Sequence, residues 1–523
     1  MNEWQRNIFL ARRLAQAGRF TKMLQICGKI IQTHSDNHDA LLDVAVLLLN
    51  FGYHTRAREC CERARLLAPN DLRPVVNLAN LFRDAGNHAE AQRFYAALQA
   101  AQPNNPVIRR NLLVTQEYDP FITDSERLLH ARAWGDWAIT QAGGWCARPI
   151  LSSLTGRSLR LGYVSADFCQ HTVGLFVKDV LKAHDPVRVT VFVYSAGTVV
   201  DWVTDEIRAV CTFRDVAALD DATLACLIQQ DKIDVLVDLS GHTAGSRLTA
   251  FAKRPAPVQV SWLGYFATTG LPHIDAVLLD EWHAPPGTEA QFSEPIVRLP
   301  SGRFCYQPVP WSPAEVASLP SSRAGHITFG CFNNTAKLNA GVFDVWAKVL
   351  IAVPDSQLVL KWRTLVDEPL CDSIRSAFVQ RGIDPARISL RPASFHVDVL
   401  KEYADIDIAL DPFPFTGGLT SCEALWMGIP VVTWPQSRVV SRQTFALLSA
   451  IGLPEFAAND AEDYVRIAVT LAADRVRLAA LRSGLRSRMQ SSPLMDVAGF
   501  TRQLENTLYQ LYADIAEKKP QLI

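Results

Sequence analysis

The sequence has no long hydrophobic segment. No run approaches the roughly 18 apolar residues of a membrane-spanning helix, and the N-terminal stretch lacks the apolar core of a signal peptide. We therefore expect a cytoplasmic protein that has no membrane partner. Neither sign of charge dominates, because 52 basic and 53 acidic residues give a formal net charge of -1. A basic surface for nucleic acid is therefore not expected.

Cysteine is present without a pattern. The 11 cysteines are scattered, with no Cys-x-x-Cys pair and no His/Cys spacing typical of a metal site. Cys60 and Cys61 are adjacent within a helical pattern and are expected to be reduced thiols in a core. With 523 residues, of which 49% are hydrophobic, the chain has room for about three domains.

Residues 1–115 carry an internal repeat. Gly18, Gly52 and Gly86 are spaced by 34 residues, as are Pro69 and Pro103. Small residues recur in the same phase at Ala11, Ala45, Ala79, Ala57 and Ala91. This is the spacing of tetratricopeptide repeats, in which small residues let paired helices approach and the glycine makes the turn. Such an array predicts a surface for a polypeptide; a dimerisation or packing element, as in a homodimer, is the alternative.

After the repeats, strand patterns alternate with helix patterns. In the first α/β unit, strands are predicted at 159–168, 189–197, 233–242 and 257–266. Beyond a Pro/Ser-rich linker, strands are predicted at 326–333, 356–363, 386–392, 406–413 and 429–434. This alternation predicts doubly wound parallel sheets. Two Rossmann-like halves of this kind enclose a cleft at the carboxyl ends of their strands.

The predicted fold class is therefore α plus α/β, with helical repeats followed by two Rossmann-like domains. We place the boundaries as follows: repeats 1–115, helical connector 116–155, first Rossmann-like domain 156–310, second domain 326–496 and C-terminal helix 497–523. The last helix is expected to pack across the α/β part. Its alternative is a free terminal helix, which its aromatic residues disfavour.

The stretch 406–430 is the one around which the chain is organised. A short apolar strand leads into a proline-rich turn and the pair Gly417-Gly418, and a helix is expected to begin near Thr420. A strand, a glycine loop and a helix N-terminus present unpaired N–H groups and a positive dipole end, which suits a diphosphate. The alternative is a capping box, in which Thr420 caps the helix and Glu423 reaches back.

Polar residues follow several predicted strands. Asp167 and His171 follow the first strand, and His242 ends the third. Two histidines at one cleft are candidates for acid–base chemistry, although a lone histidine is usually structural. The loop after the fourth strand adds candidates for the acceptor side or the sugar pocket, namely Gly264, Tyr265, Thr268 and Thr269.

The first strand of the second unit ends in another polar group, Asn333, Asn334 and Lys337. We expect Lys337 to begin a helix and to neutralise a diphosphate leaving group; surface charge is the alternative. Asp405 and Asp407 form an Asp-x-Asp pattern, which holds a metal in some sugar transferases. Here the pattern leads into a buried strand, so we expect a structural role, no metal and no other cofactor.

Four motifs carry a resemblance that covers essentially the whole chain: GYVSADFCQH, DVLVDLSGHTAG with RPAPVQVSWLGY, FGCFNNTAKLN and DPFPFTGGLTSCEALWMGIPVVT. Together with the repeats, they resemble the O-GlcNAc-transferase-like family of protein glycosyltransferases. That family joins tetratricopeptide repeats to a GT-B catalytic region and includes the SPINDLY-type O-fucosyltransferases. The resemblance implies an inverting, metal-independent transfer of sugar from a nucleotide-sugar to a protein hydroxyl.

The resemblance also implies roles for individual residues. Lys337 would meet the donor diphosphate, Glu423 would hold the ribose hydroxyls, and His171 would lie near the reacting centre, with His242 as a second catalytic candidate. The other donor-binding residues would be Asn333, Asn334, Thr416, Gly417, Gly418, Leu419 and Thr420.

Some features depart from the animal O-GlcNAc transferases. Their His-Thr-Thr run is replaced by Gly418-Leu419-Thr420, so one hydroxyl contact is missing. FNNTAK and DLSGHT look closer to the SPINDLY type, which uses GDP-fucose, and DPFPF is similar to bacterial asparagine N-glucosyltransferases. We expect UDP-GlcNAc as donor and Ser or Thr of a protein as acceptor. The alternatives are GDP-fucose transfer, glucosylation of asparagine, an inactive scaffold and a nucleotide-sugar epimerase.

Overall fold

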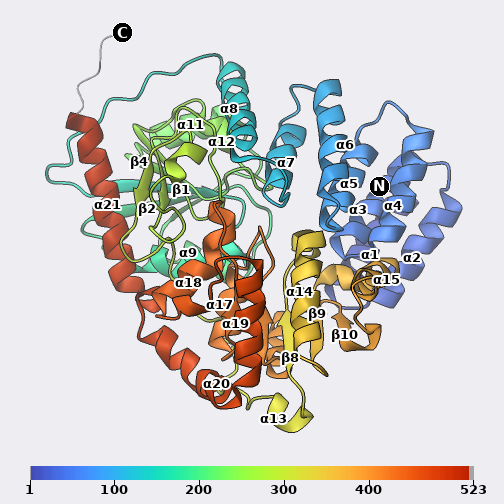
Figure 1. The fold of residues 1–523 in the computed structure, drawn as a ribbon. Helices are drawn as coiled ribbons and strands as arrows, with labels where there is room; N and C mark the ends of the chain where they lie inside the picture. Colours follow the sequence, from blue (N-terminus) through green and yellow to red (C-terminus); the bar gives the residue numbers. More distant parts are fainter. Residues whose placement is uncertain (1, 518–523) are drawn as a thin grey trace.

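The structure, a computed structural model, describes residues 2–517. A helical N-terminal part, blue in Figure 1, is followed by two α/β domains. The helical part contains α1 Glu3–Gln16, α2 Phe20–Thr33, α3 His38–Asn50, α4 His54–Leu67, α5 Arg73–Asp84, α6 His88–Ala101, α7 Pro106–Gln116 and α8 Asp124–Gln141. Within the described residues, no helix is both long enough and apolar enough to span a bilayer.

The predicted 34-residue repeat is confirmed by the helical hairpins α1–α2, α3–α4 and α5–α6. Each hairpin turns at a glycine in the left-handed region, with φ of +72° at Gly18, +89° at Gly52 and +79° at Gly86. Other residues adopt this conformation rarely, which explains why glycine recurs at this position. Small residues between the paired helices, such as Ala45 and Ala79, are fully buried.

The first α/β domain is built, within residues 2–517, on a seven-stranded parallel sheet of order β3-β2-β1-β4-β5-β6-β7. Its strands are β1 Leu159–Ser165, β2 Val189–Ser195, β3 Thr212–Asp215, β4 Val235–Asp238, β5 Val258–Trp262, β6 Ala276–Leu279 and β7 Ile296–Arg298. Its helices are α9 Thr172–Ala183, α10 Trp202–Arg208, α11 Asp221–Gln230 and α12 Leu248–Phe251. Four strands match the prediction, whereas β3, β6 and β7 were not predicted.

The second domain has, within the same described range, a five-stranded parallel sheet of order β10-β9-β8-β11-β12. Its strands are β8 Thr328–Cys331, β9 Gln357–Lys361, β10 Ile388–Arg391, β11 Ile408–Leu410 and β12 Val431–Val432, all at predicted places. Its helices are α13 Ser321–Ala324, α14 Ala340–Ala352, α15 Glu368–Val379, α16 His396–Glu402, α17 Leu419–Trp426, α18 Gln443–Ala450, α19 Ala461–Ala473 and α20 Arg475–Gln490.

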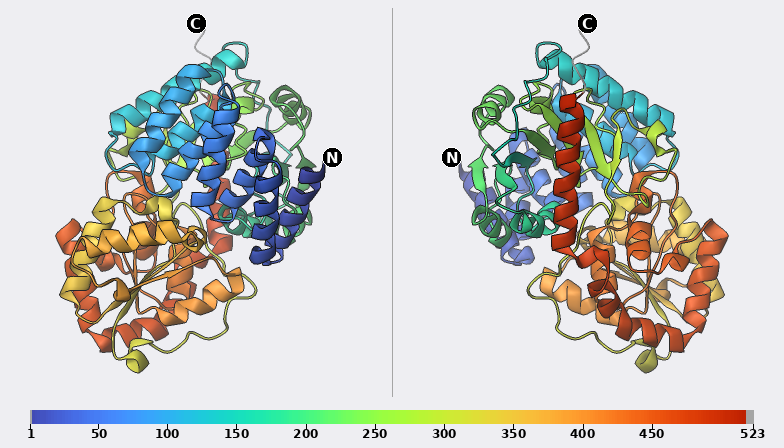
Figure 2. Two further views of the ribbon diagram at one scale, coloured as in Figure 1. Left: turned by 90° about the vertical axis from the view of Figure 1, so that its right-hand side faces the viewer. Right: turned by 90° about the vertical axis from the view of Figure 1, so that its left-hand side faces the viewer.

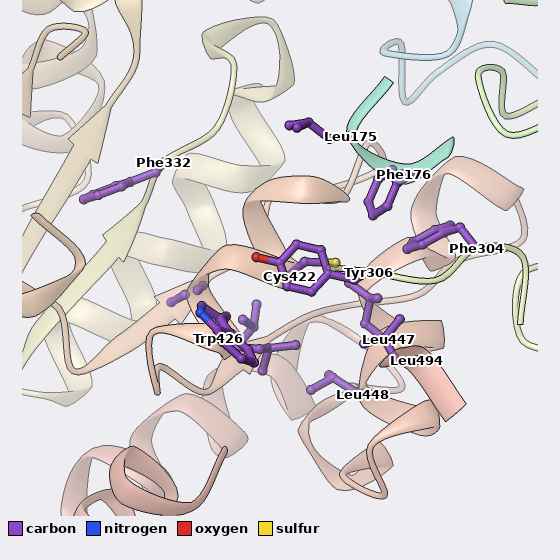
Figure 3. Packing of buried hydrophobic residues seen from close by; sticks show 14 of the residues in the cluster. Leu175, Phe176, Phe304, Tyr306, Phe332, Cys422, Trp426, Leu447, Leu448 and Leu494 are labelled. Atoms are coloured by element: carbon purple, nitrogen blue, oxygen red, sulfur yellow. The ribbon is translucent and has the colours of Figure 1, made fainter. Parts of the chain in front are cut away.

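Apolar packing continues from one α/β domain into the other. Phe304 and Tyr306 lie between Phe176 of the first domain and Trp426 of the second (Figure 3), with ring centroids 4.4 Å apart for Phe176–Phe304 and 6.4 Å for Tyr306–Trp426. The start of the predicted linker is therefore part of this core. Burial of these rings holds the two domains beside one another.

Helix α21, Val497–Glu517, returns from the second domain to the first and runs along it (Figure 2). Glu505 on this helix accepts hydrogen bonds from His184 at 2.9 Å and Arg188 at 3.1 Å. The Tyr509 hydroxyl donates to the Arg188 carbonyl at 2.6 Å. The helix therefore joins the two α/β domains a second time. The remainder of the predicted C-terminal segment, 518–523, lies outside the described residues.

The repeat turns pack directly on the second α/β domain. A Cβ atom at Gly52 would lie 2.2 Å from the Arg363 carbonyl oxygen, and one at Gly86 would lie 2.2 Å from that of Leu338. The Thr55 hydroxyl donates to Asp367 at 2.8 Å. The array is therefore a packing element, one of the two uses considered from the sequence, and its glycines serve both the turn and the contact.

Two glycine-to-alanine substitutions separate the need for glycine in the turn from the need for glycine at the contact. Gly86 and Gly156 have similar φ values, +79° and +74°, but a Cβ at Gly156 would meet no atom within 4 Å. We expect Gly156→Ala to lower the free energy of unfolding by about 1 kcal/mol, the cost of the backbone conformation. Gly86→Ala should cost about 3 kcal/mol, because the Leu338 backbone must also move. Urea unfolding measures the free energy of unfolding of both variants. Equal losses in the two variants would contradict the tight contact at Gly86.

Candidate active site

A cavity of about 610 Å³ lies between the two α/β domains, at the carboxyl ends of their strands. The first domain and the residue after the repeats contribute Tyr118, His171, Thr172, Val173, Thr243, Leu263, Gly264 and Phe266. The second domain contributes Phe332, Asn333, Asn334, Lys337, Lys361, Trp362, Arg363, Ala393, Ser394, His396, Val399, Tyr403, Phe415, Gly418, Leu419, Thr420, Glu423 and Gln443. Its position and size suit a nucleotide-sized ligand.

Lys337 is fixed at the wall of this cavity. Its ammonium donates to Asn333 Oδ1 at 2.9 Å and to the Thr416 carbonyl at 2.8 Å, and it lies 4.6 Å from the centre of the Phe415 ring. An ammonium has three N–H donors, so these two bonds leave one for a ligand. Burial lowers the pKa of Lys337 to about 8, although Asp411 nearby favours the charged form. Lys337 ends a 3-10 turn, Thr335–Lys337, and the predicted start of an α-helix there is wrong.

The loop that follows β11 is held by a buried carboxylate. Asp411 accepts the Gly417 N–H at 2.7 Å and the Thr433 hydroxyl at 2.7 Å, and burial raises the pKa of this carboxyl. The Thr416 hydroxyl donates to the Val440 carbonyl at 2.9 Å. The Thr416 hydroxyl and the Gly417 N–H are therefore bonded within the protein, and neither residue lines the cavity.

The next turn presents the N-terminus of α17 to the cavity. The helix begins at Leu419 after Gly418, one residue before the predicted start. The N–H groups of Leu419 and Thr420, in the first turn, have no acceptor within the helix. A Cβ at Gly417 would lie 2.2 Å from Ser421 Oγ, so glycine lets this hydroxyl approach the loop backbone. The first turn of α17 thus has the geometry expected of an anion-binding element.

The capping-box interpretation of this helix is wrong. The Thr420 hydroxyl donates to Asn333 Oδ1 at 3.0 Å instead of capping the helix. Glu423 pairs with His396, whose Nε2 lies 2.7 Å from Oε1, and this hydrogen bond raises the pKa of His396. Asn333 therefore joins Lys337 to the helix N-terminus, while Asn334 accepts the Ala336 N–H at 3.0 Å and shapes the preceding turn.

His171 lies at the opposite wall and is about half exposed, with 49% of its side-chain surface accessible. It precedes α9, where its Nδ1 accepts the Val173 N–H at 3.4 Å and lies 3.7 Å from Asp167. A neutral imidazole that accepts at Nδ1 carries its proton on Nε2. Proton removal by Nε2 would therefore require the other tautomer, in which Nδ1 carries the proton on the side of Asp167.

The structure does not bring His242 to the cavity. His242 is 1% exposed, its Nε2 donates to the Thr269 carbonyl at 2.8 Å, and the rings of Trp134 and Tyr265 pack edge-on against it. Thr269 also donates to Glu294 through its N–H and its hydroxyl, at 2.7 and 2.8 Å. Of the loop candidates only Gly264 lines the cavity; Tyr265, Thr268 and Thr269 do not.

Several cavity residues were not predicted from the sequence. The chief ones are Tyr118, Phe266, Lys361, His396 and Phe415. Lys361 is the last residue of β9, at the carboxyl edge of the sheet, so its place in the strand alone could have identified it as a cavity residue. Tyr118 follows α7 and His396 is the first residue of α16, and neither belongs to a motif that one sequence shows.

The two carboxylates of the Asp-x-Asp pattern bind groups of the protein. Asp407 accepts the N–H groups of Ser321 at 3.0 Å and Thr328 at 2.8 Å, and Asp405 pairs with Arg391 at 2.7 Å. Across residues 2–517, no group of three or more His, Cys, Asp or Glu side chains is arranged to hold a metal ion.

Comparison with known proteins matches this architecture to a family. The model of glycosyl transferase family 41 matches residues 148–307 and 316–504. The chain belongs to glycosyl transferase family 41. The match covers both α/β domains and therefore includes every cavity residue except Tyr118. A point mutant of the Thermobaculum terrenum O-GlcNAc transferase has a similar structure, with a TM-score of 0.87, 33% identity and coverage of 99% of both chains.

Two plant proteins are also similar. A Petunia hybrida protein named probable UDP-N-acetylglucosamine–peptide N-acetylglucosaminyltransferase SPINDLY is 39% identical over 371 residues, which are 68% of this chain and 39% of the relative. The Arabidopsis thaliana protein of the same description named SEC is 30% identical over 88% of this chain and 46% of the relative. The chain thus spans less than half the length of these curated relatives.

The buried position of His242 predicts a pH effect on stability. Burial lowers the pKa of His242 to about 4, so the unfolded chain binds a proton between about pH 6.5 and 4 that the folded chain does not. Stability should therefore fall as the pH is lowered through this range, by up to about 3 kcal/mol from this residue.

Replacement of the histidine tests this effect. His242→Gln, which keeps a side-chain donor, should make the free energy of unfolding less dependent on pH between 6.5 and 4. His34→Gln, at a partly exposed histidine, serves as the control. Urea unfolding at several pH values gives the answer. Parallel pH curves for His242→Gln and the wild type would show that His242 is not held neutral by burial.

Proposed function

We propose that this family 41 member transfers a sugar from a nucleotide-sugar to Ser or Thr of a protein, with UDP-GlcNAc as the first candidate donor. The observation that carries the proposal is the cavity in which the Lys337 ammonium and the N-terminus of α17 converge. Positive groups of this kind suit a diphosphate. The names of the SPINDLY, SEC and O-GlcNAc transferase relatives supply the donor and the peptide acceptor.

The chemistry follows from these groups. The acceptor hydroxyl oxygen attacks the anomeric carbon of the sugar from the face opposite the diphosphate, and the bond from that carbon to the β-phosphate oxygen breaks, with inversion. The electron pair leaves with the diphosphate, whose charge Lys337 and the N–H groups of Leu419 and Thr420 stabilise without a metal. The hydroxyl proton passes to a base at the opposite wall, where His171 is the nearest candidate.

Recognition of the two substrates uses different parts of the cavity. Glu423, oriented by His396, is proposed to accept hydrogen bonds from the ribose hydroxyls. The acceptor polypeptide is proposed to enter beside His171 and Gly264 and to contact the repeat array. GDP-fucose is the second candidate donor, because the FNNTAK and DLSGHT motifs resemble the SPINDLY type, for which that resemblance implies GDP-fucose.

The proposal predicts metal-independent binding of one nucleotide. Purified protein is heated with UDP, GDP, UDP-GlcNAc or GDP-fucose in the presence of EDTA. A ligand at a hundredfold excess over its dissociation constant should stabilise the fold by about 2.7 kcal/mol. A shift with uridine ligands alone supports UDP-GlcNAc, and a shift with guanine ligands alone supports GDP-fucose. The absence of any shift would contradict the proposal and favour an inactive scaffold.

Lys337→Met tests the leaving-group role. Sugar transfer to a peptide should fall by about 100-fold or more, because one donor to the developing charge is lost, while the melting temperature without ligand should change little. Lys348→Met, at an exposed lysine on α14, is the matched control and should retain activity. Transfer by Lys337→Met at the wild-type rate would remove this lysine from the mechanism.

A further inference from the structure

The segment that follows the repeat array reaches the cavity. Tyr118, two residues after α7, lines the cavity wall. Its ring lies 4.5 Å from the ring of Phe415, measured between centroids. On its other side, the ring stacks on His88, the first residue of α6, at 6.0 Å. An aromatic side chain from the helical part is therefore in contact with the loop that precedes α17.

Phe415 is where the three parts of the protein meet. Besides Tyr118, it contacts Phe266 of the first α/β domain, with centroids 5.3 Å apart in a T-shaped arrangement. The Lys337 ammonium lies 4.6 Å from the centre of the Phe415 ring. Only 9% of Phe415 is exposed. Because a cation is attracted to the face of an aromatic ring, the position of this ring affects the position of the ammonium.

The segment that carries Tyr118 is anchored to the second α/β domain. The buried Arg438 guanidinium donates to the Asp119 carbonyl at 2.7 Å and also to the carbonyl of Ile122. Two residues further on, Val440 accepts the Thr416 hydroxyl at 2.9 Å. Tyr118 and the loop that contains Thr416 are thus attached to the same short segment, which fixes one relative to the other.

We propose that Tyr118 is a positioning residue for donor binding, which holds Phe415 against Lys337 and so keeps the ammonium aimed at the donor diphosphate. This inference rests on the proposed function, and it extends the donor site to the connector that follows the repeat array. The ring of Tyr118, not its hydroxyl, is the part that matters. Loss of the ring should weaken binding of a nucleoside diphosphate about fivefold to tenfold, the range of a disturbed cation–π contact.

The experiment compares two ligands that differ only in the β-phosphate. Calorimetric titration gives the dissociation constants of UDP and UMP, or of GDP and GMP if the wild type binds guanine nucleotides. Tyr118→Leu keeps most of the apolar volume and removes the ring, and Tyr118→Phe keeps the ring. Phe94→Ala, which removes a partly buried ring of the same array, is the control. Circular dichroism and thermal unfolding confirm that each variant is folded; Tyr118→Met replaces Tyr118→Leu if the latter is not.

We expect Tyr118→Leu to weaken binding of the diphosphate about fivefold to tenfold. Binding of the monophosphate should stay within about twofold of the wild-type value. Tyr118→Phe and Phe94→Ala should match the wild type. Equal loss of affinity for both ligands would show a merely structural role, and an unchanged diphosphate affinity would show no role. A loss of diphosphate affinity in Tyr118→Phe would assign the effect to the hydroxyl. Each of these outcomes overturns the inference. A wild-type protein that binds neither diphosphate contradicts the proposed function itself.

Discussion

Three groups hold the Lys337 ammonium, and the arrangement of the cavity depends on them. The Asn333 amide oxygen and the Thr416 carbonyl take two of its N–H donors, and the Phe415 ring faces the charge. Thr416 and Phe415 belong to the loop that the buried Asp411 carboxylate fixes from within. A lysine on a flexible stem is thereby confined to one position, which reduces the entropy lost when an anion binds.

Parts of the chain far from the cavity also help to hold the Lys337 ammonium in its position. The repeat turns at Gly52 and Gly86 lie against backbone of the second α/β domain, and Arg438 fixes the start of the connector beside the cavity. Helix α21 and the aromatic layer around Tyr306 hold the two α/β domains together. The repeats pack on the second α/β domain, so a truncation of the array would uncover the backbone at Arg363 and Leu338 and remove the Thr55 partner of Asp367.

Much of the fold could be predicted because its signals are local. The repeat follows from glycine and alanine at fixed intervals, and the predicted strands are apolar runs bounded by turn residues. Of the three strands that were missed, β3 has mostly polar, partly exposed residues and β7 has only three residues. The third, β6, is a buried apolar run of four residues, and its short length is its only weakness as a signal. Within the site, Lys337 and the Gly417-Gly418 turn lie in contiguous motifs. Tyr118, Phe266 and His396 reach the cavity through tertiary packing. His242 was predicted to end a strand, but β4 ends at Asp238 and the His242 ring packs against Trp134 of α8.

The central claim is that Lys337 and the N-terminus of α17 bind the donor diphosphate. A crystal structure of the protein with UDP or GDP, whichever binds, tests it most directly. The account predicts that an oxygen of the β-phosphate lies within about 3 Å of the Lys337 Nζ and of the N–H groups of Leu419 and Thr420. A nucleotide bound outside this cavity, or bound within it with its phosphates turned away from Lys337, would contradict the account.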